Sequence, residues 1–237
     1  MQIACDGELP RSSDFEQIGE LLPLEGARLI ELGCGAAFTT RRLAETFPVR
    51  EIVAMEVDQI QHDKNLLIPD LPNVRFQFGG AQKIDLPDDW ADAVIMLKSL
   101  HHVPVSDMDA AFGEIARVLR PGGLAYISEP VYAGEFNDIL RLFNDEKLVR
   151  EAAFEATRRS VERGILALEK EVHFHSTTRF EGFEEFEHRI LGATHSSFDI
   201  DEVLHTQVKE RFMPHVGDNG VAEFLSPLRV DLLRKPG

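Results

Sequence analysis

The sequence predicts an α/β protein built on a doubly wound, mostly parallel β-sheet. Through the first half of the chain, short apolar segments of strand length alternate with segments of helical periodicity. Strands separated by helices form parallel βαβ units, whose right-handed crossovers place helices on both faces of the sheet. A Gly-Cys-Gly turn follows the first apolar segment, and such turns occur where a strand leads into a ligand-binding helix.

Five strands are predicted in the first half, each bounded by a turn or a helix. Leu29–Leu32 ends at the glycine turn, and Val74–Phe78 alternates apolar and polar side chains. The other three are the apolar runs Glu51–Val57, Ala91–Leu97 and Leu124–Ser128. The helices predicted between them are Thr39–Phe47, Ile60–Leu67 and Asp107–Leu119, the last ended by Arg120-Pro121-Gly122-Gly123.

The second half is predominantly helical in pattern. Residues 134–171 form a helical stretch, and Val172–Thr177 alternates weakly as a strand. Two helices at Phe183–Leu191 and Asp199–Phe212 precede a closing edge strand at Pro227–Leu233. We expect residues 1–133 and 172–237 to form the core, and residues 134–171 to form a helical lid, because insertions past strand ends cover the ligand crevice.

Composition narrows the possible partners. The 237 residues carry a formal charge of −16, which disfavours nucleic acid, because its phosphates bind clustered Lys and Arg. The polar, acidic N-terminus does not resemble a secretory signal, and no apolar run is long enough to span a membrane. The two cysteines suit a reducing compartment. We therefore expect a cytoplasmic protein, monomeric or homodimeric, with a small-molecule substrate.

The glycine turn and the next strand suggest an adenosine site. Gly33 and Gly35 let the backbone turn tightly, and the following helix offers free N–H groups to a ligand. Glu56 ends the next strand, where a carboxylate can accept hydrogen bonds from both ribose hydroxyls. Asp58 is a less suitable candidate, because it lies beyond the apolar strand.

Four ordered motifs together resemble class I S-adenosylmethionine-dependent methyltransferases. They are ELGCG, AMEVD, DLPDDWADAVIMLKSLHHV and EIARVLRPGGLAYISEP, within residues 25–131. The most similar group contains the ubiquinone and menaquinone C-methyltransferases and their small-molecule relatives. The resemblance implies a seven-stranded Rossmann-like sheet and methylation with S-adenosyl-L-methionine, leaving S-adenosyl-L-homocysteine as product.

The resemblance also implies residue roles. Residues of the glycine turn and its helix would surround the methionine part of the cofactor, Glu56 and Val57 would hold the ribose and adenine, and a later segment would contact adenine. Two residues past the fourth strand would line the sulfonium end. The residues around the methionine part are Glu31, Gly33, Gly35, Ala36 and Thr39. The later adenine segment is Gly80, Ala81 and Gln82, and the residues at the sulfonium end are Lys98 and Ser99.

Two positions depart from the pattern of the family. Its third glycine is replaced by Ala36 or Ala37, and the Asp that usually contacts adenine is replaced by Gly80. The adenine amino group then needs another acceptor, either Gln82 or a backbone carbonyl.

A dinucleotide-dependent dehydrogenase is the main alternative from the glycine turn alone. Its Gly-x-Gly-x-x-Gly fingerprint fails here, because Phe38 occupies the last position. A cofactor-binding regulatory protein without transfer activity, and a methyltransferase of a tRNA or protein substrate, are two further alternatives.

The reacting end offers few distinct residues, because methyl transfer from a sulfonium by in-line displacement depends mainly on positioning and water exclusion. His101, His102 and Glu129 follow the fourth and fifth strands and are the candidate catalytic residues, each with a structural role as the alternative. His173 and His175 would share one strand face, but no ligand spacing supports a metal, and we expect none. Cys34 is interpreted as a packing residue.

Overall fold

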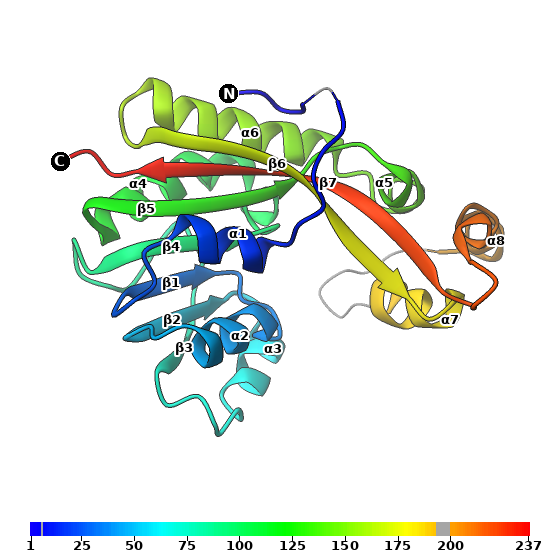
Figure 1. Cartoon of the computed structure of the whole chain (residues 1–237), viewed down its shortest axis with the longest axis horizontal. Helices are drawn as coiled ribbons and strands as arrows, with labels where there is room; N and C mark the ends of the chain where they lie inside the picture. The colour runs from blue at the N-terminus through cyan, green and yellow to red at the C-terminus, as the bar shows by residue number, and fades with distance from the viewer. Residues whose placement is uncertain (6, 193–199) are drawn as a thin grey trace.

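The computed structural model describes residues 1–5, 7–192 and 200–237, and its centre is one seven-stranded sheet (Figure 1). The strand order is β3-β2-β1-β4-β5-β7-β6. The strands are β1 (Arg28–Leu32), β2 (Glu51–Glu56), β3 (Val74–Phe78), β4 (Ala91–Leu97), β5 (Leu119–Pro130), β6 (Ala167–Phe180) and β7 (Ala222–Arg234). The first five pair in parallel, whereas β7 is antiparallel to both β5 and β6.

Helices lie on both faces of this sheet and in its extension. They are α1 (Asp14–Leu21), α2 (Phe38–Thr46), α3 (Gln59–Asn65), α4 (Met108–Val118), α5 (Glu135–Leu140), α6 (Lys147–Glu162), α7 (Phe183–Phe186) and α8 (Glu202–Phe212). Short 3₁₀ turns η1 (Leu100–His102), η2 (Val105–Asp107) and η4 (Met213–His215), and a π-turn, η3 (Glu187–Leu191), complete the described elements.

Alternation along the central strands sends side chains to two separate cores. Ile30, Val53 and Val94 pack with α4 and α6 on one face. Their neighbours Leu29, Ile52 and Ala93 pack with α1 and α2 on the other. Because successive strand residues point to opposite faces, central strands covered on both sides are apolar throughout. This is why the sequence shows these strands as continuous apolar runs.

The strands β6 and β7 are longer than their neighbours and extend beyond the sheet as a two-stranded ribbon (Figure 1). Helices α5, α7 and α8 gather around this ribbon, where a third core is rich in phenylalanine. We call this part the distal lobe; its core residues are Ile139, Phe180, Phe183, Phe186, Val208, Phe212, Ala222 and Phe224.

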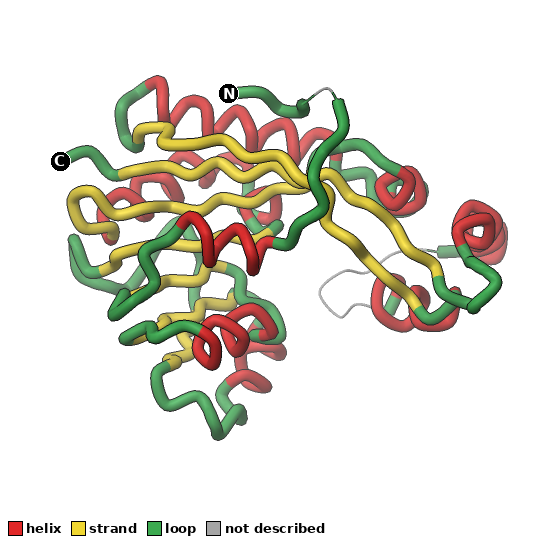
Figure 2. The backbone as a smooth tube through the Cα atoms, in the orientation of Figure 1, coloured by secondary structure: helices red, strands yellow, loops and turns green. Residues whose placement is uncertain are grey.

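The N-terminal segment crosses the ribbon as an extended loop (Figure 2). The backbone of His175 in β6 accepts a hydrogen bond from Ser12 N–H at 3.0 Å and donates one to the carbonyl of Pro10 at 2.8 Å. Arg11 thereby forms an isolated parallel bridge with His175. This contact ties the start of the chain to the outer strand of the sheet.

The structure confirms the predicted fold class and corrects several elements of the second half. The helical stretch predicted to reach residue 171 ends at Glu162, and the strand expected to begin at Val172 begins at Ala167. The final strand starts at Ala222 and lies between β5 and β6, so the prediction of an edge strand was wrong. The predicted start of a helix at Asp199 lies outside the described residues, and that helix begins at Glu202.

Candidate active site

The candidate cofactor site lies where the strand order reverses. After β3 the chain returns to add β4 on the other side of β1, and ligands of open α/β sheets bind at such switch points. Gly33 adopts φ +76°, and a Cβ at this position would lie 2.8 Å from Ser99 Cβ. Ser99 Oγ donates to the carbonyl of Leu32 at 2.9 Å. Glycine is therefore required for the ends of β1 and β4 to approach this closely.

Glu56 is fixed against the glycine turn by backbone donors. Its Oε2 accepts from Gly35 N–H at 2.7 Å, and its Oε1 accepts from Val57 and Asp58 N–H at 2.8 and 2.9 Å. A carboxylate offers about four lone-pair sites, so Oε2 retains capacity for a further donor. Asp58 instead caps α3 by accepting from Ile60 N–H at 2.9 Å. The structure thus favours Glu56 over Asp58 as a ligand-binding carboxylate.

The methionine side of the predicted site contains a buried acid. Glu31 accepts a hydrogen bond from Thr40 Oγ1 at 2.6 Å. Burial raises the pKa of Glu31 to about 7, and the negative charge of Glu56 acts in the same direction, against the Thr40 hydrogen bond. Of its predicted neighbours, Ala36 is exposed and Thr39 is half-buried. Ala37 precedes the helix with φ +60°, in the left-handed region that glycine adopts most readily.

The predicted adenine contacts come together on the other side of Glu56. Val57 is 60% exposed, so its aliphatic surface is open to a flat ring. A Cβ on Gly80 would lie 2.5 Å from Gln82 Oε1 and 3.1 Å from Val57 Cγ1. The Gln82 amide thus fills the space that a side chain at position 80 would use, while Ala81 is buried beneath.

A pocket of about 200 Å³ opens beside Lys98 at the ends of β4 and β5. Lys98 has φ +54°, a conformation that few non-glycine residues adopt. Apolar and polar side chains from five stretches of the chain form its walls. The lining residues are Lys98, His101, His102, Pro130, Val131, Ala133, Phe136, Asn137, Leu140, Glu146, Arg150, Ser176, Thr178, Ser226, Pro227 and Leu228.

Of the three predicted catalytic residues, two line the pocket and one does not. His101 and His102 line the pocket, whereas Glu129 is buried behind His101. Glu129 contacts His101 Nδ1 at 2.5 Å through Oε2 and accepts from Leu100 N–H at 2.9 Å through Oε1. This pairing orients the His101 ring, so Glu129 is a positioning residue and only the histidines face the cavity.

Sequence reasoning missed the part of the pocket wall beside His101, where Glu146 Oε2 lies 3.7 Å from His101 Nε2. Glu146 accepts from Arg150 Nη2 at 2.7 Å, and Arg150 Nη1 donates to Asn137 Oδ1 at 2.9 Å. Burial raises the pKa of Glu146, but His101 and Arg150 outweigh this and hold it below its usual value. Glu146 and Arg150 have the spacing of an ordinary surface ion pair on a helix, so only the fold reveals that they are buried.

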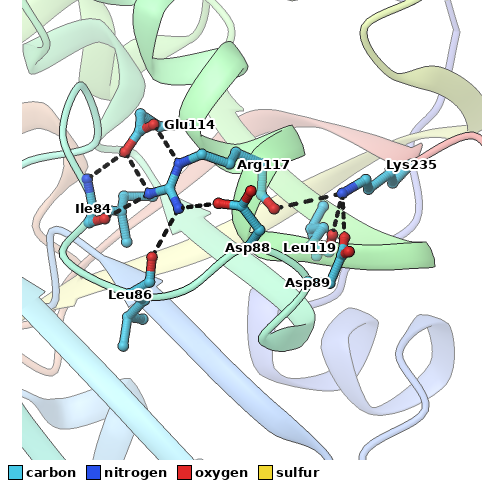
Figure 3. Close-up of polar contacts among 8 residues, drawn as sticks. All are labelled: Ile84, Leu86, Asp88, Asp89, Glu114, Arg117, Leu119 and Lys235. Atoms are coloured by element: carbon cyan, nitrogen blue, oxygen red, sulfur yellow. Dashed lines mark hydrogen bonds and ion pairs between the residues drawn. The ribbon is translucent and has the colours of Figure 1, made fainter.

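The RVLRPGG motif has a structural role here (Figure 3). Arg117 donates to the carbonyls of Ile84 and Leu86 at 2.7 and 2.8 Å and to both oxygens of Glu114. Glu114 in turn accepts from Ile84 N–H at 2.8 Å. The motif therefore fixes the loop that leads from the predicted adenine segment into β4.

Three further candidate residues, Cys34, His173 and His175, do not line the pocket. Cys34 is buried, and burial raises the pKa of its thiol, which suits the predicted packing role. His173 contacts Glu171 at 3.4 Å, and the backbone of His175 bonds the N-terminal segment. Among residues 1–5, 7–192 and 200–237, only His101, His102 and Glu146 form a group of three potential metal ligands. None of the helices in this described part is long and apolar enough to cross a membrane.

Comparisons with known proteins point to one family. Residues 29–123 match the family described as a methyltransferase domain. An uncharacterized methyltransferase of Mycobacterium tuberculosis is 38% identical over 108 residues, which are 46% of this chain and 42% of the relative. The fatty-acid O-methyltransferase of Mycolicibacterium smegmatis is 33% identical over 100 residues, 42% of this chain and 36% of the relative. The matches thus span less than half the length of these relatives.

The fold extends the likeness to the whole chain. A crystal structure from Bacillus halodurans, described as that of a methyltransferase, superposes with a TM-score of 0.67, covering 95% of this chain and 100% of the other at 17% identity. The domain match and the shared fold, together with the glycine turn and Glu56 at the switch point, agree. Residues 29–123 therefore match a methyltransferase domain, and the chain as a whole has the fold of this methyltransferase structure.

Proposed function

We propose that the protein transfers a methyl group from S-adenosyl-L-methionine to a small-molecule acceptor by in-line displacement. The observation that carries this proposal is the position of Glu56, held by Gly35 N–H at 2.7 Å at the switch point of the sheet. A carboxylate there accepts hydrogen bonds from ribose hydroxyls, and Val57, Gly80 and Gln82 lie together beside it. The sulfonium end would then point past Ser99 toward the pocket.

The pocket supports a small and partly apolar acceptor. Its volume of about 200 Å³ suits a compact molecule rather than a protein loop or a nucleic-acid strand. Pro130, Phe136 and Leu140 provide apolar walls, and Ser226 Oγ is a buried hydroxyl with no hydrogen-bond partner among the described residues. The named relative that methylates a fatty acid is consistent with an acceptor of this kind.

Methyl transfer of this kind needs no covalent bond between the protein and the methyl group. The cofactor, when bound, supplies an activated methyl group on a sulfonium. Gly33 and Ser99 bring the strand ends together and so fix the floor on which the cofactor would lie. Where the accepting atom must lose a proton, His101 and His102 are the pocket-lining groups able to take it. Positioning and exclusion of water provide the rest of the acceleration.

Calorimetric titration with S-adenosyl-L-methionine and S-adenosyl-L-homocysteine tests the cofactor. We expect Glu56→Ala to weaken binding at least tenfold, about 1.4 kcal/mol. Asp58→Asn is the matched control, because Asn caps a helix as well as Asp does, and its affinity should not change. Native circular dichroism of both variants separates loss of binding from loss of fold. An unchanged affinity of folded Glu56→Ala would remove Glu56 from the ribose role.

Transfer of labelled methyl groups tests the acceptor class. Lysate fractions separated by size are incubated with the protein and labelled cofactor, and we expect the label in the small-molecule fraction. Label that appears only in protein or RNA would contradict a small-molecule acceptor. Cofactor binding without any labelled product would instead favour a binding protein that has no transfer activity.

A further inference from the structure

The wall of the pocket holds a cluster of side chains that methyl transfer by positioning does not require. His101 and His102 come from η1, immediately after β4, and Glu146 directly precedes α6. One potential ligand atom of each lies within 4.8 Å of the others. Two histidines and a carboxylate at this spacing are a donor set that proteins use for divalent transition metals.

The hydrogen bonds of His101 leave one ring nitrogen directed at a second acceptor. Glu129 Oε2 lies 2.5 Å from Nδ1, so the proton of a neutral imidazole resides on Nδ1 and the lone pair on Nε2. That Nε2 lies 3.7 Å from Glu146 Oε2, beyond hydrogen-bond distance. The His101 side chain is 3% exposed and the Glu146 side chain 14% exposed. Two largely buried acceptors that face one another are stabilised by a cation placed between them.

The surroundings fix the orientation of two of the three side chains. Glu129 holds the His101 ring, as a carboxylate does for metal-bound histidines. Glu146 receives Arg150 Nη2 on Oε2 at 2.7 Å and Asn144 Nδ2 on Oε1 at 2.9 Å. His102 is exposed and contacts the His101 ring with a centroid separation of 4.1 Å. The cluster therefore has two oriented ligands and a third on the open side.

We propose that His101, His102 and Glu146 bind one Zn²⁺ ion, with Glu129 as the carboxylate that orients His101. Zinc–nitrogen and zinc–oxygen bonds of about 2.0–2.2 Å put ligand atoms about 3.4 Å apart in a tetrahedron. Closing from 4.8 Å needs a movement of the order of an ångström, which rotation of the exposed His102 provides. Three protein ligands leave a fourth position open, as in catalytic rather than structural zinc sites.

The open position faces the cavity because all three side chains line it. An ion there would take an oxygen of the acceptor and lower the pKa of a bound hydroxyl. The site would thus orient an oxygen-bearing acceptor whose hydroxyl proton would pass to water, and His101 and His102 would then act as ligands and not as bases. Metal binding does not rest on cofactor binding, so the two can be tested separately.

The test uses the untagged chain of 237 residues with Cys5→Ser, which removes the exposed thiol as a metal ligand. The protein is first dialysed against a chelator. Zn²⁺ is titrated by calorimetry, Co²⁺ is followed by its visible absorption, and Tm is recorded with and without metal. We expect one ion per chain, d–d bands typical of a four- or five-coordinate site, and a Tm that rises with zinc concentration.

Variants identify the ligands. His102→Ala removes an exposed side chain, and Glu146→Gln removes the charge of the carboxylate ligand. Each of these two single variants should lower zinc affinity more than tenfold. Glu129→Gln should lower it between ten- and a hundredfold while leaving stoichiometry at one. His205→Ala is the matched control, because His205 also contacts a glutamate, Glu187, at 2.5 Å but belongs to no group of three among the described residues.

Three results would overturn the proposal. The first is the absence of both binding heat and cobalt bands in the Cys5→Ser protein. The second is zinc affinity that stays unchanged in folded His102→Ala and Glu146→Gln, since the ion would then lie elsewhere. The third is a loss of zinc affinity in His205→Ala equal to that in the ligand variants.

Discussion

At the scale of single residues, the buried acid Glu31 has a measurable consequence for stability. Burial raises its pKa from 4.5 to about 7 in the folded protein. The folded state therefore keeps a proton that the unfolded chain loses between these values, and stability falls as pH rises through this window. The contribution is fully present below pH 4.5 and amounts to about 3 kcal/mol.

Urea unfolding between pH 4.5 and 7.5 measures this loss. We expect Glu31→Gln to flatten the fall, because Gln keeps a hydrogen-bonding oxygen for Thr40 and does not ionise. Glu20→Gln, on the exposed side of α1, is the control and should retain the wild-type profile. A profile that is equally steep in Glu31→Gln would assign the effect to another group.

The predictability of site residues from sequence depends on how local their partners are. Gly33 and Glu56 stand at strand ends, so the strand pattern itself predicts their position. Glu146 and Arg150 share an ordinary helical spacing, and only the packing of α6 near η1 buries them. Their place in the pocket depends on contacts between distant segments, which no local pattern encodes.

At the scale of elements, Arg117 joins helix α4 to the loop that precedes β4. Its guanidinium makes five hydrogen bonds, to Glu114, Ile84, Leu86 and Asp88 (Figure 3). Arg117→Ala leaves two carbonyls and two carboxylates without this donor, and we expect a loss of about 2 kcal/mol in unfolding free energy. Chemical denaturation measures it.

Arg158→Ala provides the comparison for this variant. Arg158 also pairs with two glutamates, Glu155 and Glu162, but on an exposed face of α6. Exposed helical pairs contribute about 0.5 kcal/mol or less each. Equal losses in the two variants would mean that the contacts of Arg117 with the loop backbone add nothing.

The elements of the second half show why its prediction was less accurate. β6 is half-buried at the sheet edge and carries charged residues from Glu169 to Glu171, so its start has the polarity of a helix surface. β7 lies inside the sheet, between β5 and β6, although the sequence predicts an edge strand at Pro227–Leu233. Its pairing with both β5 and β6 follows from the antiparallel return of the chain, which is not visible in local periodicity.

At the scale of the whole molecule, the long strands β6 and β7 pack both against the cores of the main sheet and into the core of the distal lobe. Phe212 of α8 packs against Phe183, Phe186 and Phe224, with ring centroids 5.0–5.5 Å apart, and is fully buried in the distal lobe. Phe212→Ala should destabilise by about 3–5 kcal/mol. In this variant we expect hydrogen exchange, relative to the unsubstituted protein, to accelerate in the outer halves of β6 and β7 but not in β1 and β4.

Phe112→Ala is the matched variant in the main core. It should accelerate exchange in β4 and β5 as well, because α4 covers those strands. Identical exchange patterns in the two variants would show that the lobe and the sheet open as one cooperative unit.

The long ribbon also bears on how such a protein diversifies. The proposed cofactor contacts come from residues 31–99, whereas the far wall of the pocket is formed by Ser176, Thr178, Ser226 and Pro227 on β6 and β7. Changes in the ribbon can therefore alter which acceptor fits while the cofactor-binding turn keeps its sequence. The family match ends at residue 123, before either strand of this ribbon begins. This division of labour makes exchange of the lobe between relatives a practical route to new methyl acceptors.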